Sequence, residues 1–232
     1  MAKREVCDLD QVVVFGIGRG AEVATRYFKD DSSYEVVAYT VDDAYSDRNQ
    51  FMERPVVPFS RVESEFPPDE CRMFVPLGFQ RMNSLRAAKF EEARKKGYSL
   101  ANYISSRVSA WELPRVGQNC WILEANIFEY NVTIGDDVVL WSGNHIGDLC
   151  VIESHAWISS HAVLSGEVTV GAYSFLGVNA TVSNKVQIGP RSYIGANALI
   201  TQDTPPDSVY VAKGTPRIEQ IDSLRFLGMI KN

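Results

Sequence analysis

The second half of the chain carries a large apolar residue at every sixth position. Counting back from Ile200 in steps of six reaches Ile122 without a break, and every position on the way is large and apolar. The residues two places before these positions are small or of medium size, from Ala198 back to Cys120. An α-helix has a period of about 3.6 residues and a strand a period of two, so neither explains this spacing.

A six-residue period fits a triangular coil, in which three short strands complete one turn of about 18 residues. Each strand would point one large side chain inward, and a small residue would lie at each tight corner. Such a solenoid buries a continuous core only by stacking its turns. A β-sandwich with many glycine turns is the alternative, but it would not keep one register for about eighty residues. The sequence therefore predicts an all-β parallel coil from about residue 104 to residue 200.

The first part of the chain shows a strand, a glycine turn and a helix in succession. Residues 12–15 are apolar, Gly16, Gly18 and Gly20 follow, and residues 22–29 form an amphipathic stretch. In this setting backbone N–H groups and the helix N-terminus can bind a phosphate. The alternative is that the glycines only permit a tight turn, and the motif alone does not decide between the two.

Further strands are predicted at residues 34–41 and 73–78, and a helix at residues 82–96. Asp42 and Asp43 lie at the carboxyl end of the 34–41 strand, where an acidic residue of a dinucleotide enzyme would hold a ribose. A full NAD domain needs about six strands, and only about 100 residues precede the coil. We therefore predict a truncated, Rossmann-like α/β domain with a parallel sheet, of a size that fits a mononucleotide.

Composition limits the class of protein. The 232 residues have a formal net charge of −6 and no basic run, so no nucleic-acid partner is indicated. No stretch approaches the ~18 apolar residues of a membrane span, and the polar N-terminus lacks the flanks of a signal peptide. Cys7, Cys71, Cys120 and Cys150 form no C-x-x-C pair, so neither a zinc site nor a disulfide framework is indicated. We expect a cytoplasmic protein with reduced thiols.

The repeat resembles that of the hexapeptide-repeat acyltransferases, which implies a left-handed parallel β-helix. A truncated glycine-turn domain joined directly to such a coil resembles the sialic-acid O-acetyltransferase (NeuD-type) family of sugar O- and N-acyltransferases. Local strings along the chain extend this resemblance; they begin at Phe15 (FGIGR), Val41 (VDDA), Pro55 (PVVPF), Trp141 (WSGNHIG) and Gly177 (GVNAT).

The resemblance implies an acyl-CoA-dependent enzyme, with acetyl-CoA as the expected co-substrate, no metal, and a homotrimer with acyl-CoA between adjacent subunits. The predicted domains are residues 1–103 for a nucleotide sugar, 104–215 for the coil and 216–232 as a tail. The predicted reaction is direct attack on the thioester by the amino group of a nucleotide-linked amino sugar, for surface polysaccharide or glycan synthesis. An O-acetyltransferase of a sialic acid or polysaccharide sugar, and a non-catalytic, nucleotide-sugar-binding trimeric scaffold, remain the alternatives.

The resemblance also suggests which residues bind the two substrates. Gly16, Gly18 and Gly20 would hold the pyrophosphate, and Asp42 or Asp43 would lie near the base or the ribose. Acyl-CoA would contact the coil at His161, Gly177, Ala180, Gly195 and Ala196, with Lys213 and Arg217 beyond it.

The chain departs from the family at the catalytic base. In the family the Gly166 N–H would donate to the thioester carbonyl oxygen, and the base would lie one coil, about 18 residues, earlier. That position is Asp148, where many relatives carry histidine. His145 or Asp148 could serve as the base, although an aspartate is a weak base unless burial raises its pKa. Alternatively, an unprotonated amine could react through positioning and the Gly166 amide alone, or the chain could bind without catalysing.

His155 and His161 occupy matching corner positions in successive repeats and are predicted to face outward. We expect His161 to contact CoA or the acceptor, and His155 to lie on the surface or in a subunit interface. The three histidines do not form a convincing zinc site, because stacking by one coil does not superpose them. Cys120 and Cys150 fall on small-residue positions, which predicts buried, unreactive thiols.

Overall fold

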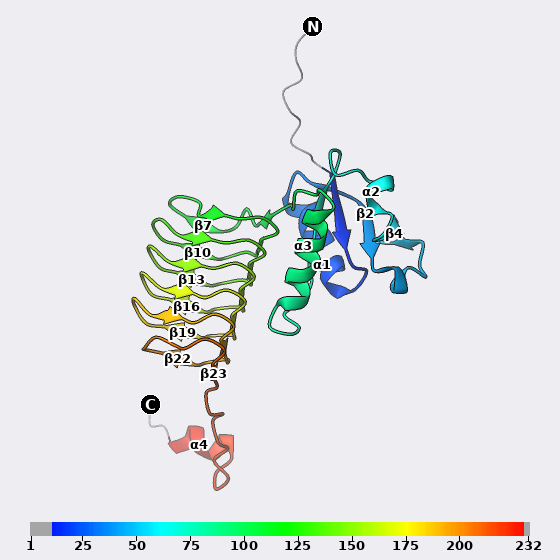
Figure 1. The fold of residues 1–232 in the computed structure, drawn as a ribbon. Helices are drawn as coiled ribbons and strands as arrows, with labels where there is room; N and C mark the ends of the chain where they lie inside the picture. The colour runs from blue at the N-terminus through cyan, green and yellow to red at the C-terminus, as the bar shows by residue number, and fades with distance from the viewer. Residues whose placement is uncertain (1–10, 230–232) are drawn as a thin grey trace.

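The computed structural model describes residues 11–229, so Cys7 and the polar N-terminal stretch lie outside the described residues. These residues form an α/β domain and a stacked coil that lie side by side (Figure 1). The C-terminal segment leaves the last coil and ends in helix α4 (Ser223–Met229). Within the described range, no helix is long and apolar enough to cross a lipid bilayer.

A five-stranded sheet forms the centre of the N-terminal domain, in the order β3-β4-β2-β1-β5. Four strands run parallel, and β3 pairs antiparallel with β4. The elements in chain order are β1 (Gln11–Phe15), α1 (Arg19–Asp31), β2 (Glu35–Val41), a 3₁₀ turn (Asp43–Tyr45), β3 (Gln50–Phe51), β4 (Arg54–Pro58), α2 (Val62–Glu65), β5 (Arg72–Phe74) and α3 (Ser84–Lys95). Alternation along β1 sends Val12 and Val14 to the α1 side and Val13 and Phe15 to the α3 side.

The predicted truncated Rossmann-like domain is confirmed, with two differences in its strands. The strand expected at residues 73–78 ends at Phe74, and the chain then turns towards the coil. The strands β3 and β4 were not predicted as strands, because prolines at positions 55 and 58 conceal the strand pattern of β4. β4 pairs with β2 on one side and only briefly with β3 on the other, which leaves room for these prolines.

The C-terminal half is a triangular coil with parallel strands on three faces, and each coil is offset from the next by 18 residues. The seven-stranded face contains β6 (Tyr103–Ile104), β9 (Trp121–Ile122), β12 (Val139–Leu140), β15 (Trp157–Ile158), β18 (Phe175–Leu176), β21 (Tyr193–Ile194) and β23 (Val209–Tyr210). The six-stranded face contains β7 (Ser109–Ala110), β10 (Ile127–Phe128), β13 (His145–Ile146), β16 (Val163–Leu164), β19 (Thr181–Val182) and β22 (Leu199–Ile200). The five-stranded face contains β8 (Arg115–Val116), β11 (Thr133–Ile134), β14 (Val151–Ile152), β17 (Thr169–Val170) and β20 (Gln187–Ile188).

The core of the coil confirms the predicted period. Every sixth residue from Ile122 to Ile200 is buried in one cluster, together with the small apolar residues two places earlier. The polar members of that second row are also buried, and Asn144 donates to the side-chain oxygen of Asn126 at 2.9 Å. Asn144 in turn accepts from the backbone N–H of Ala162 on the following coil at 2.8 Å, so these amides are satisfied inside the coil.

Three rows of corners join the faces. The first corner runs from the seven- to the six-stranded face (residues 141–144 in one coil), the second from the six- to the five-stranded face (147–150), and the third back to the seven-stranded face (153–156). A Cβ on Gly147, at the second corner, would lie 2.6 Å from the carbonyl carbon of Ser165 on the next coil. Close stacking of successive coils therefore requires this glycine.

The seven-stranded face packs against the α1 side of the N-terminal domain. Its outward-facing Trp121 and Trp157 are buried in one cluster with Ala21 and Phe28 of α1. Arg86 of α3 reaches the third corner, where its Nε donates to Asp137 Oδ1 and its Nη2 to the His155 carbonyl oxygen, both at 3.0 Å.

The prediction that His155 lies on a surface or subunit interface is wrong for this chain. Its side chain is only 11% exposed, and its Nδ1 lies 2.9 Å from Asp137 Oδ2. The ring also packs against Phe90 of α3, with the ring centroids 5.7 Å apart. His155 does point away from the coil interior, but the N-terminal domain covers this corner.

Candidate functional site

The glycine turn between β1 and α1 opens into a cavity of about 520 Å³, which we call the glycine-turn cavity. Gly16 has a φ of +101°, which favours glycine. A Cβ on Gly16 or Gly18 would meet nothing within 4 Å, so both residues leave their backbone open to a ligand. Within the described part of the chain, no side chain caps α1, and its N-cap residue Gly18 lines the cavity, so the N–H groups of the first turn are available there.

Gly20, the third residue of the motif, has a different role. A Cβ there would collide with the carbonyl oxygen of Pro76, in the segment that follows β5. Gly20 therefore lets α1 pack closely against that segment, as the last glycine of such motifs commonly does. The structure accounts for Gly20 by packing, whereas the surroundings of Gly16 and Gly18 are open.

The structure separates the two aspartates at the end of β2. Asp42 lines the glycine-turn cavity, and its Oδ1 accepts from Lys89 Nζ at 2.6 Å. Asp43 instead accepts from the backbone N–H of Ser60 at 3.1 Å. Hydrogen bonds from the Ser60 side chain and from this backbone N–H lower the pKa of its exposed carboxyl. Asp42 is therefore the aspartate placed to contact a ligand in the cavity.

Lys89 of α3 was not identified from the sequence. Burial alone would lower the pKa of its amine, but hydrogen bonds to Asp42 and to Glu92, at 2.6 and 2.7 Å, raise it. Its ammonium group also lies over the rings of Phe15 and Phe59, 5.5 and 5.3 Å from their centroids. Lys89 is thus held charged beside Asp42, and it lines the glycine-turn cavity together with Leu85, one helical turn earlier on α3.

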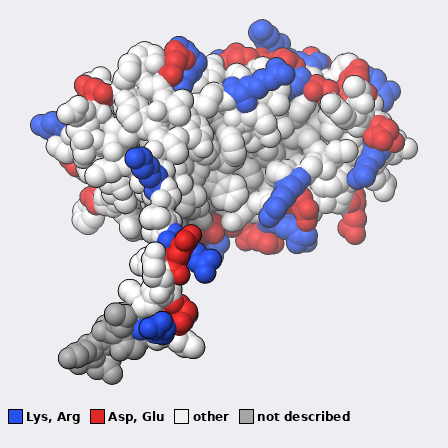
Figure 2. All heavy atoms as spheres, turned by 90° about the horizontal axis from the view of Figure 1, so that it is seen from below, with Lys and Arg blue, Asp and Glu red and all other residues white. Residues whose placement is uncertain are grey.

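A second cavity of about 550 Å³, the tryptophan cleft, lies between the two domains. It is lined by Arg19 and Gly20 at the start of α1, Phe79 and Gln80 after β5, and the indoles of Trp121, Trp141 and Trp157. Leu77 and Leu85 line both cavities, so the cleft adjoins the glycine-turn cavity. On the face seen from below, Figure 2 shows mainly uncharged side chains in the middle of the molecule, with charged side chains gathered at one end and scattered at the other.

The three indoles form a tilted row, with centroids 6.3 Å apart for Trp121 and Trp141 and 6.0 Å apart for Trp141 and Trp157. Among the described residues, the indole Nε1 of Trp121 and that of Trp141 have no hydrogen-bond partner although both atoms are buried. The sequence contained a pattern that includes two of these three indoles. The residues just before every third inward position are Tyr103, Trp121, Val139, Trp157, Phe175 and Tyr193. Because these outward-facing side chains are apolar, they indicate that another part of the protein covers this face of the coil.

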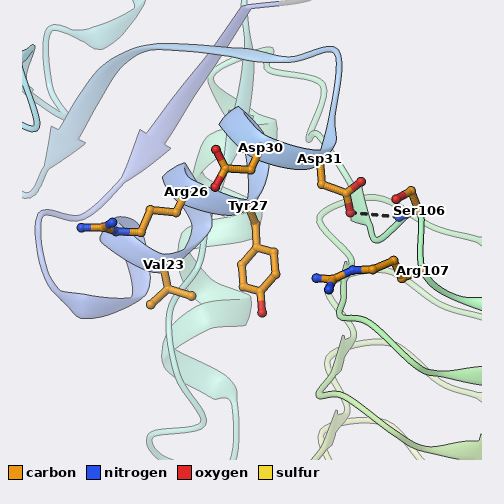
Figure 3. A pocket seen from close by; sticks show the side chains of 7 residues that line it. All are labelled: Val23, Arg26, Tyr27, Asp30, Asp31, Ser106 and Arg107. Atoms are coloured by element: carbon orange, nitrogen blue, oxygen red, sulfur yellow. Dashed lines mark hydrogen bonds between the residues drawn. The ribbon is translucent and has the colours of Figure 1, made fainter.

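A third cavity, of about 470 Å³, lies where α1 meets the first coil (Figure 3). The Tyr27 ring and the Arg107 guanidinium point into the same space, and the Tyr27 hydroxyl donates to Glu124 Oε2 at 3.0 Å. Asp31, at the end of α1, accepts hydrogen bonds from Tyr103, Ser105 and Ser106. The bonds of Asp31 to the first coil and of Tyr27 to the second coil fix the carboxyl end of α1 along the first corner.

Asp148 and Gly166 meet at the second corner, as the 18-residue spacing predicts. The Glu167 N–H donates to the Asp148 carbonyl oxygen at 2.7 Å, and a Cβ on Gly166 would collide with Asp148 Oδ1. Within residues 11–229, the Gly166 N–H donates to no acceptor. The Asp148 side chain is exposed at this corner.

The structure does not bring all the predicted site residues together within one chain. Gly16, Gly18 and Asp42 lie in the N-terminal domain, which packs on the seven-stranded face. Asp148 and Gly166 lie at the second corner, which joins the other two faces and is therefore opposite that domain.

The remaining predicted residues lie on the six-stranded face and the first corner. His145 stands on the six-stranded face between Ile127 and Val163, its neighbours on adjacent coils. His161 is exposed at the first corner. Gly177 and Ala180 lie one coil further along that corner, followed by Gly195 and Ala196, and Lys213 is exposed beyond β23. A Cβ on Gly177 would lie 2.5 Å from the Ala196 nitrogen, so coil stacking alone explains this glycine.

Cys120 and Cys150 are buried inside the coil, as predicted. Burial raises the pKa of the Cys120 thiol to about 12 and that of Cys150 to about 11. Neither is poised to act as a nucleophile. In the part of the chain that the structure describes, no group of three or more His, Cys, Asp or Glu side chains could hold a metal ion.

Several solved structures share this two-domain fold. PerB from Caulobacter crescentus, in complex with CoA and GDP-perosamine, is 26% identical with a TM-score of 0.75, over 86% of this chain and 92% of that chain. A mutant of perosamine N-acetyltransferase from the same organism, with the same ligands, is 24% identical with a TM-score of 0.75, over 88% and 97%. The acetyltransferase domain of PglB from Neisseria gonorrhoeae FA1090, in complex with acetyl coenzyme A, is 21% identical with a TM-score of 0.74, over 86% and 95%.

No protein-family model and no curated protein matches the chain. The structural likeness nevertheless covers both domains, and it confirms the predicted fold class. The chain has the fold of left-handed β-helix acetyltransferases, with a truncated Rossmann-like domain in front of the coil.

Proposed function

We propose that the chain is an acyl-CoA-dependent N-acyltransferase, with acetyl-CoA as donor and a nucleotide-linked amino sugar as acceptor. The observation that carries the proposal is the pair of adjoining cavities, one at an open glycine turn and one against the coil. They adjoin at Leu77 and Leu85, and together they lie between a helix end suited to phosphate and the surface of the coil. The solved structures of the same fold hold CoA and a nucleotide sugar, or acetyl coenzyme A.

Groups in the two cavities would bind successive parts of the acceptor. Gly16, Gly18 and the first turn of α1 present N–H groups to the pyrophosphate. Asp42 accepts from ribose hydroxyls or base N–H groups, because only one of its oxygens is engaged by Lys89. The tryptophan cleft takes the sugar, whose apolar ring face packs on the indoles. Arg19, at the start of α1, lines the tryptophan cleft and adds a positive charge near the phosphates.

The donor binds along the coil, where the Gly166 N–H has no acceptor among the described residues and is available to the thioester carbonyl oxygen. Gly177, Ala180, Gly195, Ala196 and Lys213 would line the rest of the CoA. In the domain division that we propose, residues 1–103 bind the acceptor, residues 104–215 form the acyltransferase coil and residues 216–232 are a tail. The amine attacks the thioester directly, with no acyl-enzyme intermediate, since both coil cysteines are buried.

We further propose that the site is completed by a second copy of the chain, in a homotrimer. Asp148 and Gly166 are opposite the N-terminal domain of their own chain, so an acceptor in the tryptophan cleft must meet a thioester on a neighbour. The six-stranded face exposes apolar side chains in the row of Ile127 (43%), Val163 (38%) and Leu199 (65%). Tyr130 and Leu149 extend this exposed apolar surface to the second corner.

A thiol-release assay tests the proposed function. Acetyl-CoA is mixed with the protein and a panel of UDP-, GDP- and dTDP-linked 4-amino sugars, and free CoA is measured. The proposal predicts turnover that requires one of these acceptors. Binding of a nucleotide sugar, without CoA release in the presence of any of these acceptors, would support the scaffold alternative and contradict the proposed enzymatic activity. Transfer only to hydroxyl acceptors would support the O-acetyltransferase alternative.

A further inference from the structure

His161 fills a space that exists because residue 143 is glycine. The two residues occupy equivalent places at the first corner of successive coils, and both have the left-handed backbone conformation, with φ of +61° and +81°. A Cβ on Gly143 would lie 2.5 Å from His161 Nδ1 and 2.6 Å from its Cε1. The imidazole therefore lies over the Gly143 backbone, with Nδ1 towards Gly143 and Nε2 further away.

The three histidines of the described chain differ in what engages them. His155 is buried and paired with Asp137. His145 stands in the apolar row of the six-stranded face, which we assign to contact between copies. The His161 ring is exposed and, within residues 11–229, makes no hydrogen bond or ion pair. His161 thus presents an unengaged imidazole in a defined position.

The path of α1 places the acceptor near this imidazole. The helix runs along the first corner. Asp31 bonds to Ser106 on the first coil (Figure 3), and Tyr27 bonds to Glu124 on the second coil. Arg19 is eight residues before Tyr27, a distance of about 12 Å along the helix at 1.5 Å per residue. Two coils, from Glu124 to Ser160, rise about 10 Å at the usual strand spacing. The glycine-turn end of α1 is therefore level with the coil that carries His161.

The lining of the tryptophan cleft agrees with this placement. Trp141 is the residue just before Ser142 and Gly143, and Trp157 is on the strand that leads to His161. Both indoles face Arg19 and Gly20 across the cleft. A sugar that extends from phosphates at the glycine turn into the cleft would direct its substituents towards the first corner.

We propose that His161 is the general base of acyl transfer for an acceptor bound to its own chain. This inference rests on the proposed function. The acceptor nitrogen forms a bond to the acyl carbon, the carbon–sulfur bond breaks, the amine proton passes to His161 Nε2, and CoA leaves as a thiolate that takes up a proton. Histidine suits this step because imidazole exchanges protons near neutral pH.

Gly143 is a positioning residue for His161. Any side chain at position 143 must displace the imidazole, although the imidazole itself would remain. Gly143→Ala should therefore reproduce the kinetic effect of His161→Gln. A general base commonly contributes about 10²–10⁴-fold to the rate, so both variants should lower kcat by a hundredfold or more. The KM for the nucleotide sugar should change little.

The test compares kcat, KM and the pH–rate profile of wild type, His161→Gln and Gly143→Ala with the best acceptor from the thiol-release panel. Arg191→Ala is the matched control: Arg191 is an exposed residue at a third corner with the same left-handed backbone conformation, and Ala125 at a first corner shows that alanine can adopt this conformation. Circular dichroism and nucleotide-sugar binding identify any variant that fails to fold.

The expected result is a loss of kcat and of the acidic limb of the pH profile in both test variants, with wild-type kinetics in Arg191→Ala. Turnover by wild type together with an unchanged kcat in folded His161→Gln would overturn the role of His161 and leave the proposed function standing. No turnover by wild type with any acceptor would overturn both. A folded Gly143→Ala with full activity would overturn the positioning role of Gly143.

Discussion

Arg86 carries the largest predicted energetic effect in the contact between the two domains. Its side chain and that of Asp137 are 1% and 0% exposed, and its Nε lies 3.0 Å from Asp137 Oδ1. Its other nitrogens donate to the carbonyl oxygens of Asp137, His155 and Gly78 and to Asn83 Oδ1. Arg86→Met leaves the Asp137 carboxylate buried without its cation. Loss of one partner from such a buried pair costs about 3–5 kcal/mol of unfolding free energy.

In a chain of this length, 1 kcal/mol shifts the Tm by about 2–4 °C, so Arg86→Met should lower the Tm by about 6–20 °C. Thermal unfolding followed by circular dichroism measures the shift. Arg54→Met is the control, because Arg54 and its partner Glu35 are 45% and 59% exposed. An exposed pair is worth about 1 kcal/mol or less. Adding Asp137→Asn to Arg86→Met should recover part of the loss, since no unpaired charge is then buried.

Equal Tm shifts in Arg86→Met and Arg54→Met would refute the reasoning, because they would show that burial of the Arg86–Asp137 pair adds nothing. The variant also bears on the site. Arg86 donates to Gly78 and lies over the Trp157 ring, 5.6 Å from its centroid, and both residues line the tryptophan cleft.

Three further predictions follow from individual residues. Hydrogen bonds from Ser106 and Tyr103 hold the pKa of Asp31 well below its ordinary value, so Asp31 stabilises the fold above about pH 4 and loses this contribution as the pH falls. In urea titrations, the stability of Asp31→Asn should therefore depend less on pH below 4 than that of wild type. Identical pH profiles for the two proteins would contradict this stabilising role of Asp31. Cys120 and Cys150, with pKa values raised to about 12 and about 11, should resist a thiol reagent at pH 8 in the folded protein and react after unfolding; rapid labelling of either native thiol would contradict their burial. Lys89→Met removes the cation that orients Asp42, so the dissociation constant for a nucleotide should rise by about tenfold with little change in Tm. Calorimetric titration measures this dissociation constant. Lys95→Met, at the exposed end of α3, is the control.

The coil could be predicted from sequence because its structural signal is local and repeated. Ile122 to Ile200 keep one phase, and each of these residues is buried by the same stacking rule. The same rule correctly placed Asp148 over Gly166. The glycine turn was equally readable, since Gly16 to Gly20 follow a buried strand directly.

The contact between the domains could not be predicted from the sequence in the same way. Arg86, Lys89 and the partners of His155 depend on how α3 docks against the third corner, and no short-range period encodes that docking. His155 was therefore misplaced although its outward direction was correct. The apolar outward row around Trp121 and Trp157 was the one available signal of a covered face. The roles of Gly16 and Gly20 also differ for a reason that only the fold reveals, namely the position of Pro76.

The most direct test of the central claim is to identify the bond that carries the acetyl group in the product. The protein is incubated with acetyl-CoA labelled with ¹³C in the acetyl carbonyl and with the acceptor that gives the highest turnover, and the product is examined by NMR and mass spectrometry. The account predicts one acetyl group per sugar, in an amide at the former amino nitrogen, with one CoA released for each amide. An acetyl ester, or an acceptor recovered unchanged although it binds, would contradict it.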